Sequence, residues 1–207
     1  MSHIAIISGS HRPTGNSPRI ARYIEKQLHA QGHTTYLLDL SQSELPFWDE
    51  GMWGAAPLAE KWQTLWQPVA AELAKAEAFI IISPEYHGMV PSKLTNFFLL
   101  CGNGSGLEHK PALAISVSAG VGGTYPITEL RAFSAKNNRM VYMPEHLIIR
   151  TAGEMFLDEV KPEHATANSI VTERLTWLLG LLEDYTQAFK TIRAAGHTAN
   201  AKFVSGM

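Results

Sequence analysis

The chain of 207 residues has a formal net charge of −2, and 45% of its residues are hydrophobic. This length is enough to bury a substantial core, and we expect a single domain over residues 1–207. The near-neutral charge favours neither a nucleic-acid partner nor an acidic membrane surface, and no apolar run is long enough to span a bilayer. One cysteine, Cys101, and the lack of a recognisable signal peptide predict a cytoplasmic protein without disulfides.

The first predicted strand and helix enclose a small polar loop. Ile4 to Ser8 is an apolar run of strand length, Gly9 to Asn16 is polar, and apolar residues at helical spacing follow. Ser17 is a good N-cap, and Pro18 suits the first helical position because the helix does not need its missing N–H there. We therefore expect the helix to open at Ser17 and to stop before Gly32.

Cations gather where this helix begins. Arg12 lies in the loop, and Arg19 and Arg22 lie in or beside the first turn, with no acidic residue until Glu25. Because the amino end of a helix already carries partial positive charge, a bound anion would account for this pattern. Loop amides, hydroxyls and a guanidinium together predict a phosphate site. The alternative is an ordinary strand-to-helix turn with solvated arginines.

The loop sequence restricts the kind of phosphate compound. Gly9 and Gly15 are one residue too far apart for a P-loop, and Asn16 stands where the phosphate-binding lysine would be. The Gly-x-Gly-x-x-Gly fingerprint of dinucleotide-binding folds is absent as well. A cradle without a lysine or a magnesium-binding carboxylate suits a tightly held monophosphate, and flavin mononucleotide (FMN) is the candidate that we favour.

Apolar runs of strand length alternate with helical stretches along the rest of the chain. The fifth strand is either Met140–Met143 or Leu147–Ile149, because Pro144 interrupts the apolar pattern. Five strands alternating with helices predict a doubly wound α/β sheet. The other predicted elements are, in order, strand 34–40, loop 45–57, helix 58–76, strand 78–83, helix 92–101, strand 112–118, helix 126–138 and helix 166–194.

Three loops of unusual composition follow the predicted strands. In a doubly wound sheet the ligand lies beyond the carboxyl ends of the strands, where the strand order reverses. This rule brings together residues 8–16, 84–91 and 118–125. In the second of these loops, Tyr86 and His87 would place an aromatic ring and free amides beside a flat heteroaromatic ligand; the alternative is a tight turn in which Tyr86 only packs.

The third loop is rich in glycine, at Gly120, Gly122 and Gly123. Without side chains, its backbone N–H groups could reach the pyrimidine end of a flavin. Such donors would stabilise the negative charge that develops there on reduction. A glycine loop is weak evidence alone and gains weight beside the other two loops.

Three motifs resemble the NADPH-dependent FMN reductase family and occur in the right order. They are GSxR with N/S at the first helix, SPEYHGMVPSKLTNF and SAGVGGTYPITELR. The resemblance implies a five-stranded parallel sheet of flavodoxin-like type in the order 2-1-3-4-5, bound FMN, and NADPH as co-substrate. The family's usual residue after Glu-Tyr is asparagine, where this chain has His87. By this resemblance the phosphate would be bound by Ser10, Arg12, Asn16 and Ser17, and the ribityl chain and ring by Pro84, Glu85, Tyr86, His87, Gly88, Ser118, Gly120 and Gly123.

The resemblance implies an oxidoreductase that passes hydride from NADPH through FMN to a small acceptor such as a quinone, an azo compound, free flavin or a metal oxyanion. The flavin carries this chemistry, so we assign no catalytic residue. His11 or His87 could supply a proton to a quinone, and so could solvent. The scattered histidines predict no metal site. An electron carrier like flavodoxin and a non-catalytic flavin-binding module are the alternatives.

Tryptophans in the loop 45–57 and apolar residues on the last helix suggest self-association. Trp48 and Trp53 either cover the sheet edge or form a dimer surface together with that helix. The helix is apolar over more than one face, as Trp177, Leu178 and Leu181 illustrate, and packing on a sheet does not require this. We expect a homo-oligomer, either a homodimer or a homotetramer.

Overall fold

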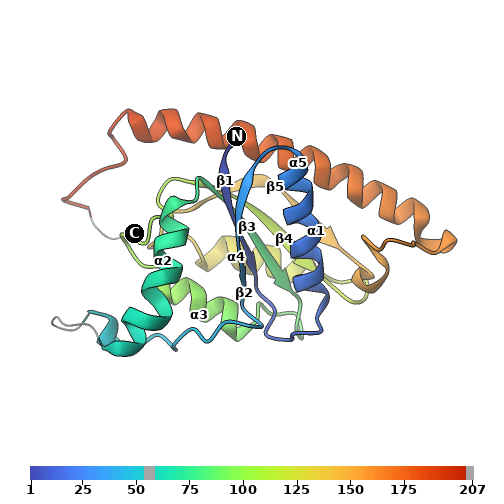
Figure 1. The fold of residues 1–207 in the computed structure, drawn as a ribbon, viewed down its shortest axis with the longest axis horizontal. Helices are drawn as coiled ribbons and strands as arrows, with labels where there is room; N and C mark the ends of the chain where they lie inside the picture. The colour runs from blue at the N-terminus through green and yellow to red at the C-terminus, as the bar shows by residue number, and fades with distance from the viewer. Residues whose placement is uncertain (54–58, 204–207) are drawn as a thin grey trace.

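A computed structural model describes residues 1–53 and 59–203 of the chain. Its centre is a five-stranded parallel sheet in the order β2-β1-β3-β4-β5 (Figure 1). This order confirms the predicted doubly wound, flavodoxin-like fold. The strands are β1 (His3–Ser8), β2 (Thr34–Asp39), β3 (Ala78–Pro84), β4 (Pro111–Val117) and β5 (Val141–Ile149).

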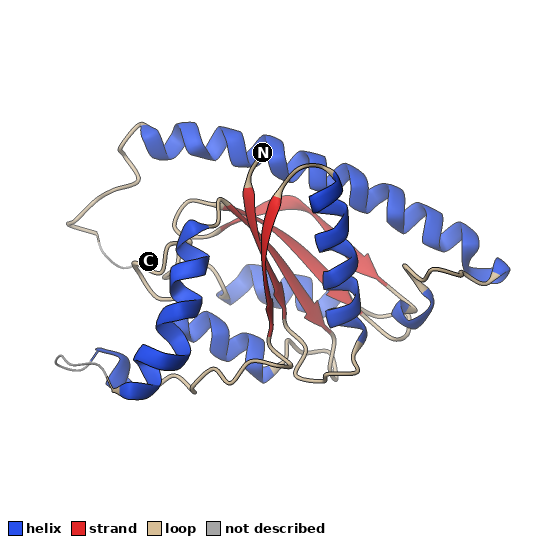
Figure 2. Cartoon of the chain, in the orientation of Figure 1, coloured by secondary structure: helices blue, strands red, loops and turns tan. Residues whose placement is uncertain are grey.

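Helices cover both faces of the sheet, which explains why the central strands are continuous apolar runs (Figure 2). Along β1, Ile4 and Ile6 pack into one apolar cluster, and Ala5 and Ile7 pack into the other. Within the described part of the chain, no helix is both long and apolar enough to cross a membrane. The first cluster includes residues of α1 (Asn16–Ala30) and α5 (Pro162–Ala194), and the second includes residues of α2 (Gln67–Lys75), α3 (Ser92–Leu100) and α4 (Thr124–Phe133).

Helix α1 begins earlier than predicted and ends as predicted. Gly15 is the N-cap residue in place of Ser17, because the loop already closes there with a 3.0 Å bond from Gly15 N to Arg12 O. Ser17 therefore lies inside the first turn. At the carboxyl end, Gly32 adopts a φ of 85° and donates to His29 O at 3.0 Å, which confirms the predicted stop.

The two candidates for the fifth strand are parts of one strand. β5 runs through Pro144, and its register against β4 shifts between Ala112 and Ala114. An edge strand tolerates proline because the missing N–H can face away from the sheet. Two predicted helices differ as well: 58–76 contains a π-helical turn, Trp62–Trp66, before α2, and α4 ends at Phe133 and not at Asn138.

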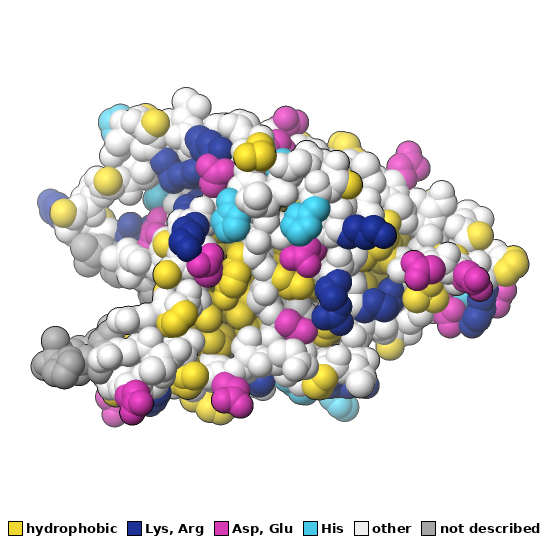
Figure 3. Space-filling model, viewed as in Figure 1, with side chains coloured by type: hydrophobic (Ala, Val, Ile, Leu, Met, Phe, Trp, Pro, Cys, Tyr) yellow, Lys and Arg dark blue, Asp and Glu magenta, His cyan; other side chains and the backbone are white. Residues whose placement is uncertain are grey.

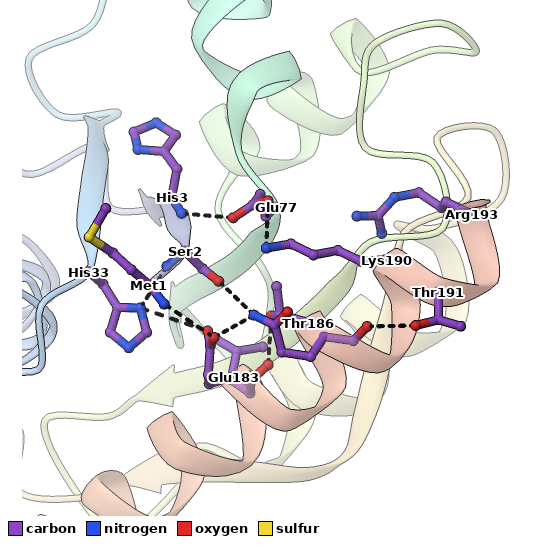
Figure 4. A network of polar contacts seen from close by, with 12 residues as sticks. Met1, Ser2, His3, His33, Glu77, Glu183, Thr186, Lys190, Thr191 and Arg193 are labelled. Carbon is purple, nitrogen blue, oxygen red and sulfur yellow. Dashed lines mark hydrogen bonds and ion pairs between the residues drawn. The ribbon is translucent and has the colours of Figure 1, made fainter.

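Polar contacts attach α5 to the amino edge of the sheet (Figure 4). Glu77, just before β3, accepts from His3 N at 3.2 Å and forms a 2.7 Å ion pair with Lys190 of α5. Glu183 of α5 lies 3.9 Å from the Met1 ammonium. These contacts join α5 to the amino ends of the strands. The three predicted ligand loops lie at the carboxyl ends, so they take no part in these contacts.

Trp48 and the last helix, which were expected to share a surface, lie on opposite faces of the sheet. Trp48 packs against the cluster that contains α2, α3 and α4, whereas Leu178 and Leu181 of α5 pack in the cluster on the other face of the sheet. Trp177 is 51% exposed, and the Trp53 side chain lies outside the described residues. The apolar pattern of α5 arises mainly from contacts within the chain, and a homo-oligomer remains a prediction.

Substitution by alanine should change the stability of the fold in opposite directions at two glycines. A Cβ at Gly9 would lie 2.5 Å from Leu94 Cδ2 and 2.8 Å from Ile82 O, whereas a Cβ at Gly180 in α5 would meet nothing within 4 Å. We expect Gly9→Ala to lower the free energy of unfolding by about 1–3 kcal/mol. Gly180→Ala, the matched control, should raise it by about 0.5–1 kcal/mol. Urea unfolding measures both, and equal effects would contradict the packing described.

The Glu77–Lys190 pair should make stability depend on pH. Burial opposes ionisation of Glu77, but the bonds from Lys190 and His3 N outweigh it and lower the pKa of this carboxyl below its ordinary value of 4.5. A lowered acid pKa contributes stability above pH 4.5, and the contribution is lost as the pH falls through the folded-state pKa. We expect Lys190→Met to cost up to about 1 kcal/mol at pH 7 and less at pH 3. Urea unfolding at both pH values tests this, with Lys75→Met, whose partner is the more exposed Glu72, as the control; a deficit independent of pH would rule out the linkage.

Candidate functional site

The three predicted loops meet at the carboxyl edge of the sheet, around a small cavity. β1, β3 and β4 end side by side, so the loops that follow them are neighbours. The cavity has a volume of about 140 Å³. Its lining residues are Arg12, Gly15, Asn16 and Ser17 of the first loop, Pro84, Glu85 and Tyr86 of the second, and Val117 and Ala119 at the third.

Ser10 holds the first loop in shape. Its Oγ accepts from Arg12 N at 3.0 Å and lies 2.8 Å from the Tyr86 hydroxyl, so it also joins the first loop to the second. The Tyr86 ring meets the exposed His11 ring edge-on, with centroids 5.0 Å apart. Ser10 was expected to contact a phosphate, whereas in this structure its hydroxyl bonds to the protein.

Ser17 presents an unused hydroxyl at the cavity. The side chain is 1% exposed, and its Oγ has no hydrogen-bond partner among the described residues. A buried hydroxyl without a partner costs roughly 1–3 kcal/mol, so such groups mark places where a ligand can bind. Asn16 and Ser17 are also the first residues of α1, where helix N–H groups lack acceptors within the helix. Together with the Arg12 side chain, these donors suit a phosphate group.

Two of the three arginines that suggested an anion are held by the protein. Arg19 donates to Ala152 O at 2.6 Å, Met155 O at 2.8 Å and Phe156 O at 3.1 Å, and burial lowers the pKa of its guanidinium. Arg22 lies 3.9 Å from Asp39. The charge argument for an anion therefore rests on Arg12 alone, and the case for the site now depends on the cavity and Ser17.

The second loop contains a tight turn with left-handed backbone. Tyr86 and Met89 exchange backbone bonds of 3.1 and 3.0 Å, with φ of 54° at His87 and 80° at Gly88 between them, as in a type I′ turn. Asparagine and histidine both tolerate this backbone, which explains how His87 can replace the family's usual asparagine. From α4, the Glu129 carboxylate accepts from Val90 N at 2.7 Å and fixes the end of the loop.

The third loop is held from two sides. Glu85 accepts from Gly123 N at 2.7 Å, and a Cβ at Gly122 would lie 2.2 Å from the same carboxylate. Arg150, just after β5, donates from Nε to Val121 O at 2.7 Å and to Gly122 O at 3.0 Å. Gly123 has a φ of 103°, and a side chain there would strike Ile148. The amide of Gly123 is therefore bound by Glu85, contrary to the expectation that it would be free for a ligand.

The predicted residues that do not line the cavity lie on the same loops. They are Ser10 of the first loop, His87 and Gly88 of the second, and Ser118, Gly120 and Gly123 of the third; Ser118 is buried. The roles of Arg150 and Glu129 could not be predicted from local sequence, because each bonds to a loop that is distant in the sequence. The cavity is also smaller than the roughly 300–1,000 Å³ typical of sites that enclose a whole ligand. It can take a phosphate and the start of a sugar chain, and a ring system would lie outside it.

Comparison with known proteins agrees with this geometry. FerB, a flavoenzyme NAD(P)H:acceptor oxidoreductase from Paracoccus denitrificans, has a similar fold, with a TM-score of 0.63 and 20% identity over 92% of this chain and 98% of FerB. An oxidoreductase from Corynebacterium diphtheriae aligns with a TM-score of 0.59 and 16% identity over 89% of this chain and 98% of that one. A flavodoxin from the domain Archaea has a TM-score of 0.52 and 15% identity over 92% of this chain and 100% of its own. At these identities the likenesses show the fold.

Sequence comparison identifies the family directly. The sequence profile of the NADPH-dependent FMN reductases matches residues 2–154, which include all three loops and every strand. Within the described residues, no group of three or more His, Cys, Asp or Glu side chains is placed to hold a metal ion. The matched span contains the phosphate-sized cavity with its buried, unpartnered serine, and the chain belongs to the NADPH-dependent FMN reductase family.

Proposed function

We propose that the chain binds FMN at the three loops and passes hydride from NADPH through it to a small acceptor, such as a quinone, an azo compound, free flavin or a metal oxyanion. Family membership supports FMN and NAD(P)H use in general. The observation that carries the proposal for these loops is that Ser17, a residue lining a phosphate-sized cavity, has a buried hydroxyl without a hydrogen-bond partner among the described residues. An anion that accepts from this hydroxyl would remove the cost of burying it.

Each loop would take a distinct part of the cofactor. Arg12, Asn16 and Ser17 would hold the phosphate through the guanidinium, the amide and the hydroxyl, with help from the first N–H groups of α1. Ser10 would keep this loop in shape through Arg12 N and Tyr86. The residues proposed to line the ribityl chain and ring are Pro84, Glu85, Tyr86, His87, Gly88, Ser118 and Gly120, with Gly123 acting through its bond to Glu85.

The protein's part in the reaction is to orient the cofactor and leave one face open. When bound, FMN supplies the hydride chemistry. A Cβ at Gly88 would meet only Tyr125, at 3.8 Å, and one at Gly120 would meet nothing within 4 Å, so a ring could approach the backbone closely at these two positions. Among the described residues that line the cavity, Glu85 is the only carboxyl or imidazole group, and it is bonded to Gly123 N. Because His11 and His87 are both exposed, solvent can supply any proton that the acceptor needs.

An electron carrier would hold FMN in the same way, and the fold of the archaeal flavodoxin is similar. Carriers of that kind dock to redox partners through an acidic face. On the face shown in Figure 3, Lys and Arg side chains are interspersed with Asp and Glu, and the net charge is only −2. This distribution favours an enzyme acting on small molecules.

We also propose that residues 1–207 form one FMN-binding domain, that the protein acts in the cytoplasm, and that it self-associates as a homodimer or homotetramer.

Reduction of bound FMN by NADPH tests the proposed function. We expect the purified protein, mixed with FMN, to show the absorption of bound flavin, and NADPH to bleach it rapidly in a stopped-flow instrument. Steady-state assays with a quinone, an azo dye and free FMN would then identify the acceptor class. Slow bleaching would indicate a carrier or a binding module, and failure to bind FMN in large excess would refute the site.

Ser17→Ala is the variant that links this test to the structure. Loss of one hydrogen bond to a charged phosphate, worth about 1.5–3 kcal/mol, should weaken FMN binding by roughly 10- to 150-fold. Without FMN, the Ser17→Ala variant should be as stable as the parent or slightly more stable, because a buried hydroxyl without a partner is removed. Flavin fluorescence titration and thermal melting measure the two effects. Ser105→Ala is the control, since its hydroxyl is also buried and unpartnered but lies in another loop.

Substitutions of His87 test whether its backbone or its side chain matters. Its φ of 54° is tolerated by asparagine and strained for alanine. We expect His87→Asn to leave stability and FMN affinity within about twofold of the parent, while His87→Ala costs roughly 1 kcal/mol of stability. Thermal melts measure the stability of each variant, and fluorescence titration measures its affinity for FMN. A large loss of FMN affinity in His87→Asn alone would show that the imidazole contacts the cofactor.

A further inference from the structure

Arg150 orients the peptides of the glycine loop. Its Nε donates to two successive carbonyls, Val121 O at 2.7 Å and Gly122 O at 3.0 Å. In a planar trans peptide the C=O and the following N–H point in opposite directions. With both carbonyls turned toward Arg150, the N–H groups of Gly122 and Gly123 must point to the opposite side of the loop.

The bond between Gly123 and Glu85 identifies that opposite side. Gly123 N donates to Glu85 Oε2 at 2.7 Å, and Glu85 lines the cavity. The Gly122 N–H points the same way and makes no hydrogen bond among the described residues, although the Glu85 carboxylate also lies against Gly122, 2.2 Å from where a Cβ would stand. One peptide is thus held at both ends, by Arg150 and by Glu85, and its neighbour offers a free donor toward the ligand side.

The attachment of Arg150 is itself rigid. The preceding residue, Ile149, is buried in the core, and Ser118 N bonds to its carbonyl at 2.9 Å. On the other side, Thr151 N donates to Gly120 O at 2.9 Å and Ala152 N donates to Ser118 O at 3.0 Å. The start of the third loop and the end of β5 therefore form one unit, with Arg150 at its centre. Arg150 is solvent-exposed, and its guanidinium places a positive charge on one side of the third loop. The Glu85 carboxylate binds the same loop from the opposite side.

We propose that Arg150 is a positioning residue of the flavin site: it aims the Gly122 N–H at the pyrimidine end of FMN and, through its charge, favours the reduced over the oxidised cofactor. The inference rests on the proposed FMN site. Fixed donors and positive charge near that end of the ring stabilise the negative charge gained on reduction. Because the oxidised ring is neutral there, the same groups contribute less to binding it.

Comparing the affinity for oxidised and reduced FMN tests this proposal. We expect Arg150→Gln to weaken binding of oxidised FMN by less than threefold and binding of reduced FMN by at least tenfold. For a two-electron couple, losses that differ by threefold lower the midpoint potential of the bound flavin by about 15 mV, and losses that differ by tenfold lower it by about 30 mV. Anaerobic titration gives both affinities, and a reference-dye equilibration gives the potential. Arg150→Lys keeps the charge and should stay within threefold of the parent in both affinities.

Arg139→Gln is the matched control, because this arginine also bonds a backbone carbonyl, that of Phe203, but precedes β5 at the opposite edge of the sheet. It should leave both affinities unchanged. Equal losses for the two redox forms in Arg150→Gln, or no loss, would overturn the proposal, and so would an Arg150→Lys variant as defective as Arg150→Gln. If the parent protein binds no FMN, the proposed function itself fails. Thermal melting of the FMN-free variants shows whether they are folded.

Discussion

The site depends on the way in which β1 leaves the sheet. Gly9 N bonds to Ile82 O at 2.8 Å, so the pairing of β1 with β3 continues one residue beyond the strand. At that point the chain passes so close to α3 that any side chain would strike Leu94 or the Ile82 carbonyl. Only glycine permits this close approach. It allows the first loop to turn beside β3, which places the amino end of α1 next to the second loop.

From this starting point the loops are joined to one another by side chains. Ser10 of the first loop meets Tyr86 of the second, and Glu85 of the second meets Gly123 of the third. Arg19 of α1 holds the segment after β5 through three carbonyls, and that segment bonds back to the third loop. Such contacts fix the loops before a ligand arrives, so less conformational entropy is lost on binding. The proposed ligand groups, Ser17 and the Gly122 N–H, are those that these contacts leave unused.

The sequence predicted those features that depend on local pattern. Apolar runs that alternate with helical stretches predicted the doubly wound sheet and the three loops, whereas the strand order 2-1-3-4-5 came from the resemblance to the FMN reductase family. Gly32 ends α1 because a left-handed residue is needed there. What it could not predict depends on contacts between distant segments. Arg19 looked like an anion ligand, yet one of its partners, Ala152, is 133 residues away. Trp48 and the leucines of α5 looked like one surface, and only the three-dimensional fold shows that the sheet separates them. Ser17 was expected to be the N-cap but lies inside the first turn, because the sequence did not reveal that the loop would close at Gly15.

The small size of the cavity bears on which acceptors the proposed enzyme can use. In the proposed site, a cavity of about 140 Å³ would hold the phosphate end of FMN, and the ring would rest on the turn at Tyr86–Met89 and the third loop, which together are called the rim. Three large apolar side chains stand exposed on that rim: Met89 is 57% exposed, Tyr125 70% and Val121 85%. None of them belongs to the contacts that fix the loops, except that Tyr125 lies beside Gly88. Binding of the cofactor and selection of the acceptor would therefore depend on different groups, backbone and buried polar atoms for the former and exposed side chains for the latter. On the proposed function, substitutions on the rim would change the acceptor without loss of the flavin.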